Sequence, residues 1–155
     1  MIHQTFNFVI RIDTGGDGGL LCEAAFAECS GLEMSAEAKT IREGGNNAGP
    51  VHLSGAVSYG TLALKRGMSE TFDLWTWFDD AHRDDRRHQR AQCEVEVRTP
   101  DRTATAYSLR LTGCMPVKLK APDLSASEGG VAIEEMEIVY ERMQLVPPTG
   151  GDRNA

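Results

Sequence analysis

Residues 93–111 read Cys-Glu-Val-Glu-Val-Arg-Thr-Pro-Asp-Arg-Thr-Ala-Thr-Ala-Tyr-Ser-Leu-Arg-Leu, and this stretch decides the fold class. Apolar and charged side chains alternate over 93–98, a period of two that is typical of a half-buried β-strand. Pro100-Asp101 marks a turn, and the alternation returns over 103–111. The stretch therefore predicts an antiparallel β-hairpin with one face on a core.

The same alternation recurs along most of the chain. It predicts further strands over 5–12, 20–26, 32–41, 57–65, 115–119 and 131–145. The segment 33–39 also contains helix formers, but its strict alternation favours a strand over a helix. In the last strand the apolar positions change parity across Glu134-Glu135, which predicts a β-bulge there.

One segment has the period of a helix instead. Ser69 is its predicted N-cap, and the helix is expected to end near Asp84. Its apolar stripe is predicted to comprise Leu74, Trp75, Phe78 and Ala81. Trp77 falls off this stripe, and an exposed Trp is more typical of an interface than of a catalytic pocket. The expected fold is mainly β, an antiparallel β-barrel or sandwich with one packed α-helix.

The segment 43–56 has no periodic pattern. It is rich in glycine and asparagine, yet carries Val51, His52 and Leu53 in its second half. Long patternless loops in compact domains tend to be functional, so we expect this loop to dock onto a partner. Residues 147–155 lack apolar anchors and are expected to form a flexible tail after a domain at 1–146.

Composition excludes several function classes. The chain has 16 Lys and Arg against 23 Asp and Glu, a net charge of −7, which disfavours a nucleic-acid groove. No apolar run is long enough for a membrane helix and no secretory signal is evident, so we expect synthesis in the cytoplasm without stable membrane association. The four cysteines, without C-x-x-C spacing, are expected to be reduced. We find no catalytic constellation and expect neither an enzyme nor a cofactor or metal.

Several short motifs occur in a fixed order across residues 5–146. They include Ser30-Gly31-Leu32-Glu33-Met34, His52-Leu53-Ser54-Gly55, Leu62-Ala63-Leu64-Lys65-Arg66-Gly67, Leu74-Trp75-Thr76-Trp77, Pro116-Val117-Lys118 and Val131-Ala132-Ile133-Glu134. Together they resemble the tail-tube protein family of contractile phages and of phage-tail-like contractile injection systems, extracellular ones included. The chain departs from the family pattern at Met115 and Leu119, where aromatics are frequent, and at Gly129-Gly130.

The resemblance implies a structural role. Hexameric rings would stack into a hollow tube inside a contractile sheath, and the tube would penetrate a target envelope and conduct protein or DNA cargo. Its partners would be further copies of the chain, the sheath protein, and baseplate and tube-terminating proteins of a phage tail or extracellular injection particle. The alternative within the same machine is a baseplate-proximal tube-initiator subunit. A hypothesis from a different functional class is a β-barrel protein that binds a small molecule.

The resemblance also assigns site residues. A ring-stacking loop would contain Gly44, Gly45, Asn46, Asn47, Val51, His52 and Leu53. Trp75 and Trp77 belong to the family's helix and are interface candidates. In two of the predicted strands, carboxylates alternate with residues that face the core, so the carboxylates face outward or toward the lumen. The lumen candidates are therefore Glu94, Glu96, Glu135 and Glu137.

Overall fold

The computed structural model describes residues 7–15, 20–24, 26–41, 44, 49–85, 89–101, 103–127 and 129–148, with ten strands and one helix in these ranges. The strands are β1 (Phe8–Asp13), β2 (Leu20–Ala24), β3 (Glu28–Ser30), β4 (Met34–Ile41), β5 (Val51–Tyr59), β6 (Thr61–Gly67), β7 (Ala91–Arg98), β8 (Thr105–Lys120), β9 (Ile133–Val139) and β10 (Arg142–Val146). The helix α1 spans Asp73–Ala81. The expectation of a mainly β, antiparallel fold with one helix is confirmed.

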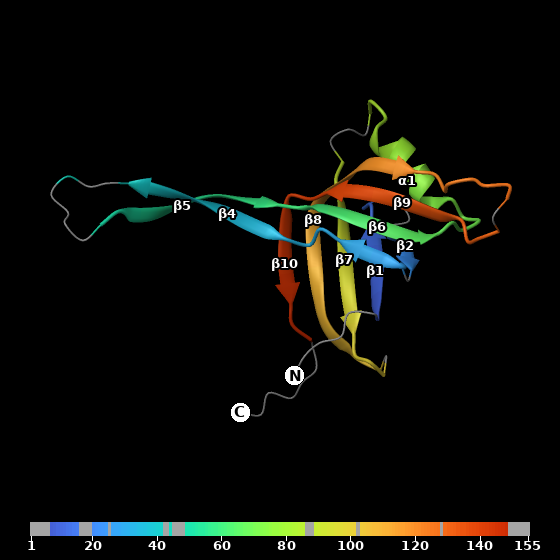
Figure 1. The fold of residues 1–155 in the computed structure, drawn as a ribbon, viewed down its shortest axis with the longest axis horizontal. Helices are drawn as coiled ribbons and strands as arrows, with labels where there is room; N and C mark the ends of the chain where they lie inside the picture. Colours follow the sequence, from blue (N-terminus) through green and yellow to red (C-terminus); the bar gives the residue numbers. More distant parts are fainter. Residues whose placement is uncertain are drawn as a thin grey trace.

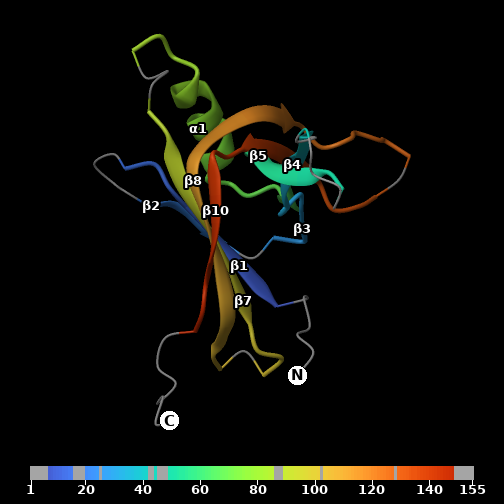
Figure 2. The ribbon, with the colours of Figure 1, turned by 90° about the vertical axis from the view of Figure 1, so that its left-hand side faces the viewer.

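One long strand organises the fold. The main sheet has the order β2-β1-β7-β8-β9-β6-β3, and β10 pairs with β8 as well. The first half of β8 lies between β7 and β10, and its second half pairs with β9. The sheet therefore folds along β8 into two layers (Figures 1 and 2). We call β2, β1, β7, β10 and the first half of β8 the first layer, and β9, β6, β3 and the second half of β8 the second layer.

The bend in β8 lies beside Gly113. This glycine has a φ of +67°, and a Cβ there would lie 2.5 Å from a carboxylate oxygen of Glu141. The register between β7 and β8 shifts at the same level, between Ala91 and Cys93. Glycine adopts positive φ without a steric cost, so this position lets β8 pass from one layer to the other.

The core lies between the two layers. The first layer contributes Ile10, Ile12, Val95 and Leu111, and the second contributes Leu62, Leu64, Met136 and Ile138. Each of these side chains is at most 2% exposed. Burial of a side chain of this size stabilises a fold by about 1.5–3 kcal/mol, so the facing rows hold the layers together.

The helix differs from the prediction in its start and in its buried face. It begins at Asp73, after Phe72 in the left-handed region at φ 51°, and not after Ser69. The Asp73 carboxylate accepts a hydrogen bond from the Leu74 N–H at 2.8 Å, which provides the acceptor expected of Ser69. Trp77 is buried at 5% exposure and Trp75 is half-buried, so the prediction that Trp77 lies off the core stripe is wrong.

The buried face follows the spacing i, i+3, i+4, i+7. It comprises Leu74, Trp77, Phe78 and Ala81. The predicted stripe shares Leu74, Phe78 and Ala81 with this face and differs from it only in containing Trp75 in place of Trp77. Trp75 instead projects toward the edge of the core, where its indole has a polar partner.

The strands near the C-terminus also differ. The predicted strands over 103–111 and 115–119 are one continuous strand, β8, while the predicted strand over 131–145 is two, β9 and β10. No register shift separates Glu134 from Glu135 in the pairing of β9 with β6. The apparent change of parity arises because Glu134, at 1% exposure, occupies an inward position that sequence reasoning reserved for apolar residues.

The largest difference concerns the predicted loop at 43–56. Its second half is the strand β5, which pairs with β4 in a separate two-stranded sheet. This ribbon, here called the arm, projects away from the two layers (Figure 1). Of the predicted tail, 147 and 148 are described without secondary structure, and 149–155 lie outside the described residues.

Candidate functional surfaces

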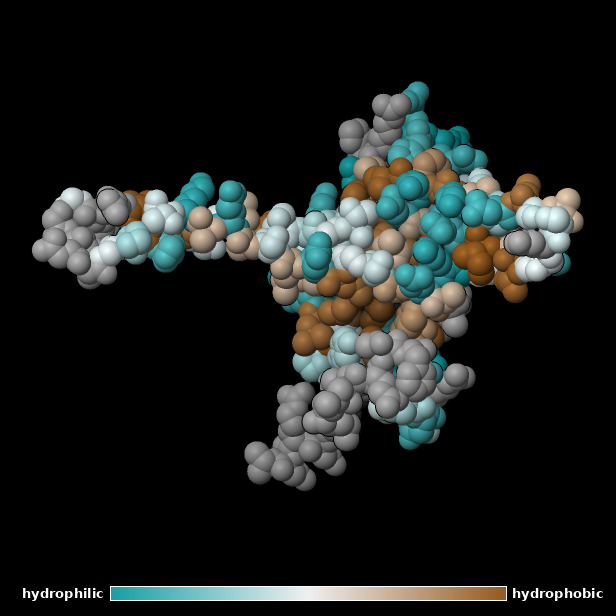
Figure 3. Space-filling view, in the orientation of Figure 1, coloured by the Kyte–Doolittle hydropathy of each residue, from teal (hydrophilic) through white to brown (hydrophobic). Residues whose placement is uncertain are grey.

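The arm is exposed along its whole length. Every residue of β4 is exposed, and so are most residues of β5. Polar and apolar side chains are interspersed along it in Figure 3. A two-stranded ribbon is marginally stable alone in water, so an arm without a covering layer is expected to gain stability from a partner.

Apolar side chains lie on both faces of the arm. Ile41 pairs with Val51 and Lys39 pairs with Leu53, which places Ile41, Val51 and Leu53 on one face near the tip. The register shifts between Ala36 and Ala38, and Val57 lies with Met34 on the other face nearer the body. The five large apolar side chains of these two patches are 36–61% exposed. Such an arrangement suits a ribbon held between two partner surfaces.

The base of the arm is fixed to the body. The Tyr140 hydroxyl lies 2.8 Å from the Gly31 carbonyl and accepts a hydrogen bond from the Glu33 N–H at 3.2 Å. The Tyr140 ring packs against Tyr59 with centroids 5.5 Å apart. Gly31 has a φ of +87°, and a Cβ there would lie 1.8 Å from the Thr61 carbonyl oxygen. Only glycine fits where the chain leaves β3 for the arm.

The predicted docking residues are divided by the structure. Gly44 is an exposed turn residue, and Val51, His52 and Leu53 are exposed residues of β5, so they lie on a strand and not in a loop. His52 forms a side-chain hydrogen bond with Thr40 at 3.4 Å across the arm. Gly45, Asn46 and Asn47 lie outside the described residues.

Glu94 and Glu96 lie on the outer face of the first layer. Arg11 on β1 contacts both carboxylates, Glu96 at 2.5 Å and Glu94 at 3.4 Å. Thr105 donates a hydrogen bond to Glu96 at 2.6 Å, and the Arg98 guanidinium lies 3.3 Å away. The Thr105 hydroxyl, followed by Arg11 and Arg98, holds the pKa of Glu96 below its usual range, and burial only partly opposes this. The face is therefore an alternating pattern of paired charges.

An open hollow continues this face toward β10. Its volume is about 680 Å³, and it extends from Glu94 and Glu96 past Ser108 and Arg110 to Pro147 and Pro148. Arg110 is exposed and lies opposite Glu94 in the strand register. The face thus has Arg and Glu side chains in alternation along its accessible surface.

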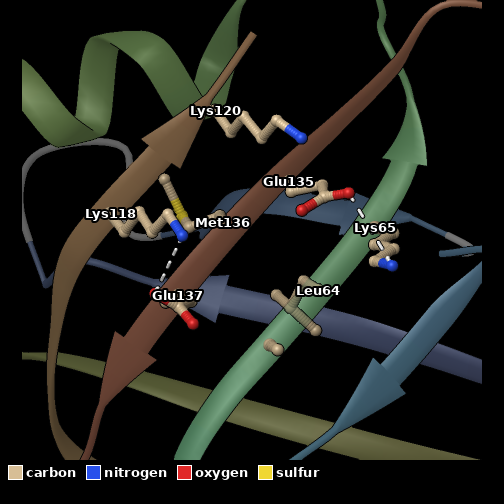
Figure 4. A pocket seen from close by; sticks show the side chains of 8 residues that line it. Leu64, Lys65, Lys118, Lys120, Glu135, Met136 and Glu137 are labelled. Carbon is tan, nitrogen blue, oxygen red and sulfur yellow. Dashed lines mark ion pairs between the residues drawn. The ribbon is translucent and has the colours of Figure 1, made fainter. Parts of the chain in front are cut away.

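Glu135 and Glu137 lie on the outer face of the second layer, shown in Figure 4. Lys65 lies 3.7 Å from both Glu28 and Glu135, and Lys118 lies 3.9 Å from Glu137. The strand registers align Glu28 with Lys65, Lys65 with Glu135, and Glu135 with Lys120, so one row of alternating charge crosses four strands. A small pocket of about 50 Å³ lies between this row and the Lys118–Glu137 pair.

The two pairs of lumen candidates therefore face away from each other. Residues that alternate with Glu94 and Glu96 point into the core from the first layer, and those that alternate with Glu135 and Glu137 point into it from the second. Since the core lies between the layers, a single channel wall can display only one of the two pairs.

A buried ion cluster, which sequence reasoning did not identify, joins the helix to the second layer. The Arg66 guanidinium lies 2.7 Å from Glu134 and also pairs with Asp73 at the start of α1. The Trp75 indole donates a hydrogen bond to the other Glu134 oxygen at 2.9 Å, and Arg66 lies over the Phe26 ring. Arg66 and Glu134 are 6% and 1% exposed. The sequence does contain an indication of this cluster: in both β6 and β9, a charged residue stands at a position where the alternation points the side chain into the core.

In the ranges that the structure describes, no group of three or more His, Cys, Asp or Glu side chains could hold a metal ion. Among the same residues, no helix is long and apolar enough to cross a membrane.

Comparisons with known proteins give one family and several similar structures. The family model described as T4-like virus tail tube protein gp19 matches residues 4–144. A chain in the anti-feeding prophage baseplate is similar, with 24% identity, a TM-score of 0.79, and coverage of 95% of this chain and 97% of that chain. A chain in the sheath–tube complex of the extracellular contractile injection system PVC is 15% identical, with a TM-score of 0.77 and coverages of 94% and 92%.

A more distant similarity is to Hcp1 from Flavobacterium johnsoniae. It is 14% identical, with a TM-score of 0.51 and coverages of 88% and 94%. At these identities the solved structures show a shared fold. Among curated proteins, none matches the sequence.

Proposed function

The chain belongs to the T4-like tail tube protein family, and on this premise we propose that it is an inner-tube subunit whose six copies form a ring and whose rings stack into a hollow tube. The family is structural, so the chain is a component of a contractile tail or injection particle and not an enzyme. The observation that carries the proposal is a first layer whose edge strands, β2 and β10, each pair on one side only among the described residues, together with an uncovered projecting arm.

Ring formation is supported by the edges of the first layer. The first layer runs β2-β1-β7-β8-β10, and among the described residues neither β2 nor β10 pairs with a second strand on its outer side. An open edge presents unpaired N–H and C=O groups that pair readily with another strand. Pairing of β10 in one copy with β2 in the next would continue the sheet around a ring.

Such a pairing would also decide which outer face lines the channel. The first layer would form the inner wall, because the second layer and α1 need the larger circumference outside it. Glu94 and Glu96, with Arg11 and Arg110, would then line the bore, and Glu135 and Glu137 would face outward toward a sheath. A wall of paired charges would give cargo few strong binding sites, which suits the passage of protein or DNA.

Ring stacking is assigned to the arm. Its apolar patches lie on both faces, and a position between subunits of the neighbouring ring would bury both. Burial of apolar area at about 25 cal/mol per Å² would favour such docking, and it would also order a ribbon that is marginal alone. Sheath and tube-terminating proteins are proposed as further partners outside and at the end of the tube.

Negative-stain microscopy of the purified full chain tests the proposal. We expect uniform hollow tubes with six-fold end views. Rings that do not stack would favour the baseplate-proximal initiator role, whereas compact monomers at high protein concentration would overturn both. A double variant, Val51→Asp with Leu53→Asp, should yield rings without tubes, while Val117→Asp, an exposed strand position on the second layer, should leave tubes unchanged.

A further inference from the structure

Exposed apolar side chains gather at the end of the body opposite the arm. Met68 follows β6, Val131 precedes β9 and Ile133 begins it, and each of the three is at least 36% exposed. The Met68 N–H donates a hydrogen bond to the Ala132 carbonyl at 2.9 Å, so the two segments lie side by side. We call Met68, Val131 and Ile133 the end patch. Hydrophobic side chains are visible at this end of the body in Figure 3.

Two further exposed apolar side chains flank the end patch. Phe72 closes the connection between β6 and α1, and Leu124 lies in the connection between β8 and β9, where it is 94% exposed. Single apolar side chains on a surface are ordinary, whereas a group of them at one place is typical of an interaction surface. The end of the body therefore has the character of a surface that another molecule covers.

The end patch and the tip of the arm complement each other in charge. On the arm, the apolar face near the tip also contains Lys39, the register partner of Leu53. The exposed carboxylates beside the end patch are Glu70, in the β6–α1 connection, and Asp123, which lies 3.8 Å from Lys120. An apolar face with one ammonium group thus matches an apolar patch at whose rim carboxylates outnumber the ammonium group.

The two surfaces lie at opposite ends of the chain. The arm leaves the body at one end, while the end of β6 and the start of β9 lie at the other (Figure 1). A contact between the arm of one copy and the end patch of the next is heterologous, so it leaves one free arm and one free end patch and can repeat. A contact between two arms would be isologous and would stop at a pair. Growth of a tube ring by ring needs the repeating kind.

We propose that the end patch is the acceptor for the arm of a second copy of this chain, in the neighbouring ring. The inference rests on the proposed function, because it names the surface that the arm meets when rings stack. The tip face of the arm would cover the end patch, and Lys39 would lie at its acidic rim. The other face of the arm, with Met34 and Val57, would remain for the second partner surface.

Photo-crosslinking of the full chain tests the contact directly. A benzophenone amino acid at position 53 places the probe on the tip face, and ¹⁵N-labelled chains are mixed with unlabelled ones. Trypsin leaves position 53 in the peptide 43–65 and the end patch in the peptides 67–83 and 121–142. We expect links between 43–65 and one of these two peptides that join a labelled chain to an unlabelled one. A probe at position 117, exposed on the second layer, is the control and should give no such link.

A pair of variants provides a second test. Val131→Asp changes a largely exposed side chain, so the chain should fold, which circular dichroism checks, and should form rings without tubes. Val117→Asp is again the matched control. Mixed with the arm variant, Val51→Asp with Leu53→Asp, the Val131→Asp chain supplies an intact arm to an intact end patch. The mixture should form pairs of rings that grow no further, and sedimentation should show twice the mass of either variant alone.

The outcomes separate this inference from the proposed assembly. Tubes in which position 53 links to other peptides, normal tubes from Val131→Asp, or a mixture without pairs would overturn the inference and leave the tube standing. Links to 67–83 or 121–142 in a chain that forms no six-fold rings would support the arm contact and overturn the ring. A chain that gives no link between labelled and unlabelled copies would overturn both.

Discussion

At the scale of single residues, the buried pair of Arg66 and Glu134 is expected to contribute strongly to stability. Both side chains are at most 6% exposed, and the cluster also holds Asp73 and the Trp75 indole. Removal of one partner from a buried ion pair leaves the other charge uncompensated. The pair therefore fixes how α1 meets the second layer.

Glu134→Gln tests this role. The amide can still accept the Trp75 hydrogen bond, but it removes the more deeply buried of the two carboxylates that pair with Arg66. Because Asp73 still pairs with Arg66, the free energy of unfolding should fall by about 3 kcal/mol, the lower end for a broken buried ion pair. Urea denaturation measures the change. Glu135→Gln is the control, because its contact with Lys65 at 3.7 Å is solvent-exposed and should contribute at most about 1 kcal/mol. Equal losses from the two variants would refute a special role for the buried pair.

A second prediction at this scale concerns Glu96 and the pH dependence of the free energy of unfolding. Its pKa is lowered in the folded chain, chiefly by the hydrogen bond from Thr105 and then by Arg11 and Arg98. A carboxyl with a lowered folded pKa contributes stability that is present above its unfolded pKa and is lost as pH falls through the folded pKa. Between pH 6 and pH 3, unsubstituted protein should therefore lose more free energy of unfolding than Glu96→Gln. Parallel curves in urea titrations at each pH would contradict the assignment.

At the scale of elements, the arm depends on the turn that carries it away from the body. Gly31 has a positive φ, and a Cβ there would overlap the Thr61 carbonyl. Gly15 has a similar φ of +74° but open space around it. The two glycines therefore separate the cost of backbone conformation from the cost of a steric clash.

Gly31→Ala should destabilise the chain far more than Gly15→Ala. Gly15→Ala should lower the free energy of unfolding by only about 1–2 kcal/mol, because its one cost is an alanine in the left-handed conformation. Gly31→Ala must also displace the backbone of β6, and should cost several kcal/mol or prevent folding. Thermal unfolding followed by circular dichroism measures both. Similar melting temperatures for the two variants would show that the base of the arm is not constrained as described.

Elements with strict alternation were predictable, and those with an inward charge were not. Residues 93–98 were placed correctly in a strand because each apolar side chain there points into the core. Glu134 broke the same rule in β9, since a paired carboxylate can occupy a core position that periodicity assigns to an apolar residue. The first part of β5, residues 51–56, was predicted as a loop because its side chains are exposed on both faces, so burial left no pattern to detect, whereas residues 57–59 fell within the predicted strand 57–65.

At the scale of the whole molecule, the two layers place the lumen candidates on two opposite outer faces, and only one of these faces can line the channel. Sequence reasoning could find Glu94, Glu96, Glu135 and Glu137 as outward carboxylates, but it could not tell that β8 folds the sheet and sets them on opposite sides. The cross-strand partners of these carboxylates, such as Arg11 and Lys65, depend on register between distant segments. A single sequence does not contain that information directly.

Accessibility in assembled tubes decides between the faces. Arg110→Cys places a thiol on the outer face of the first layer, and Lys118→Cys places one on the outer face of the second, each at an exposed position. If the first layer forms the bore, a maleimide on a bulky polymer should modify Lys118→Cys in tubes as fast as in dissociated subunits. It should modify Arg110→Cys in dissociated subunits but not along intact tubes, since only a small maleimide could diffuse down the channel. The reverse pattern would place Glu135 and Glu137, with Lys65 and Lys118, in the lumen.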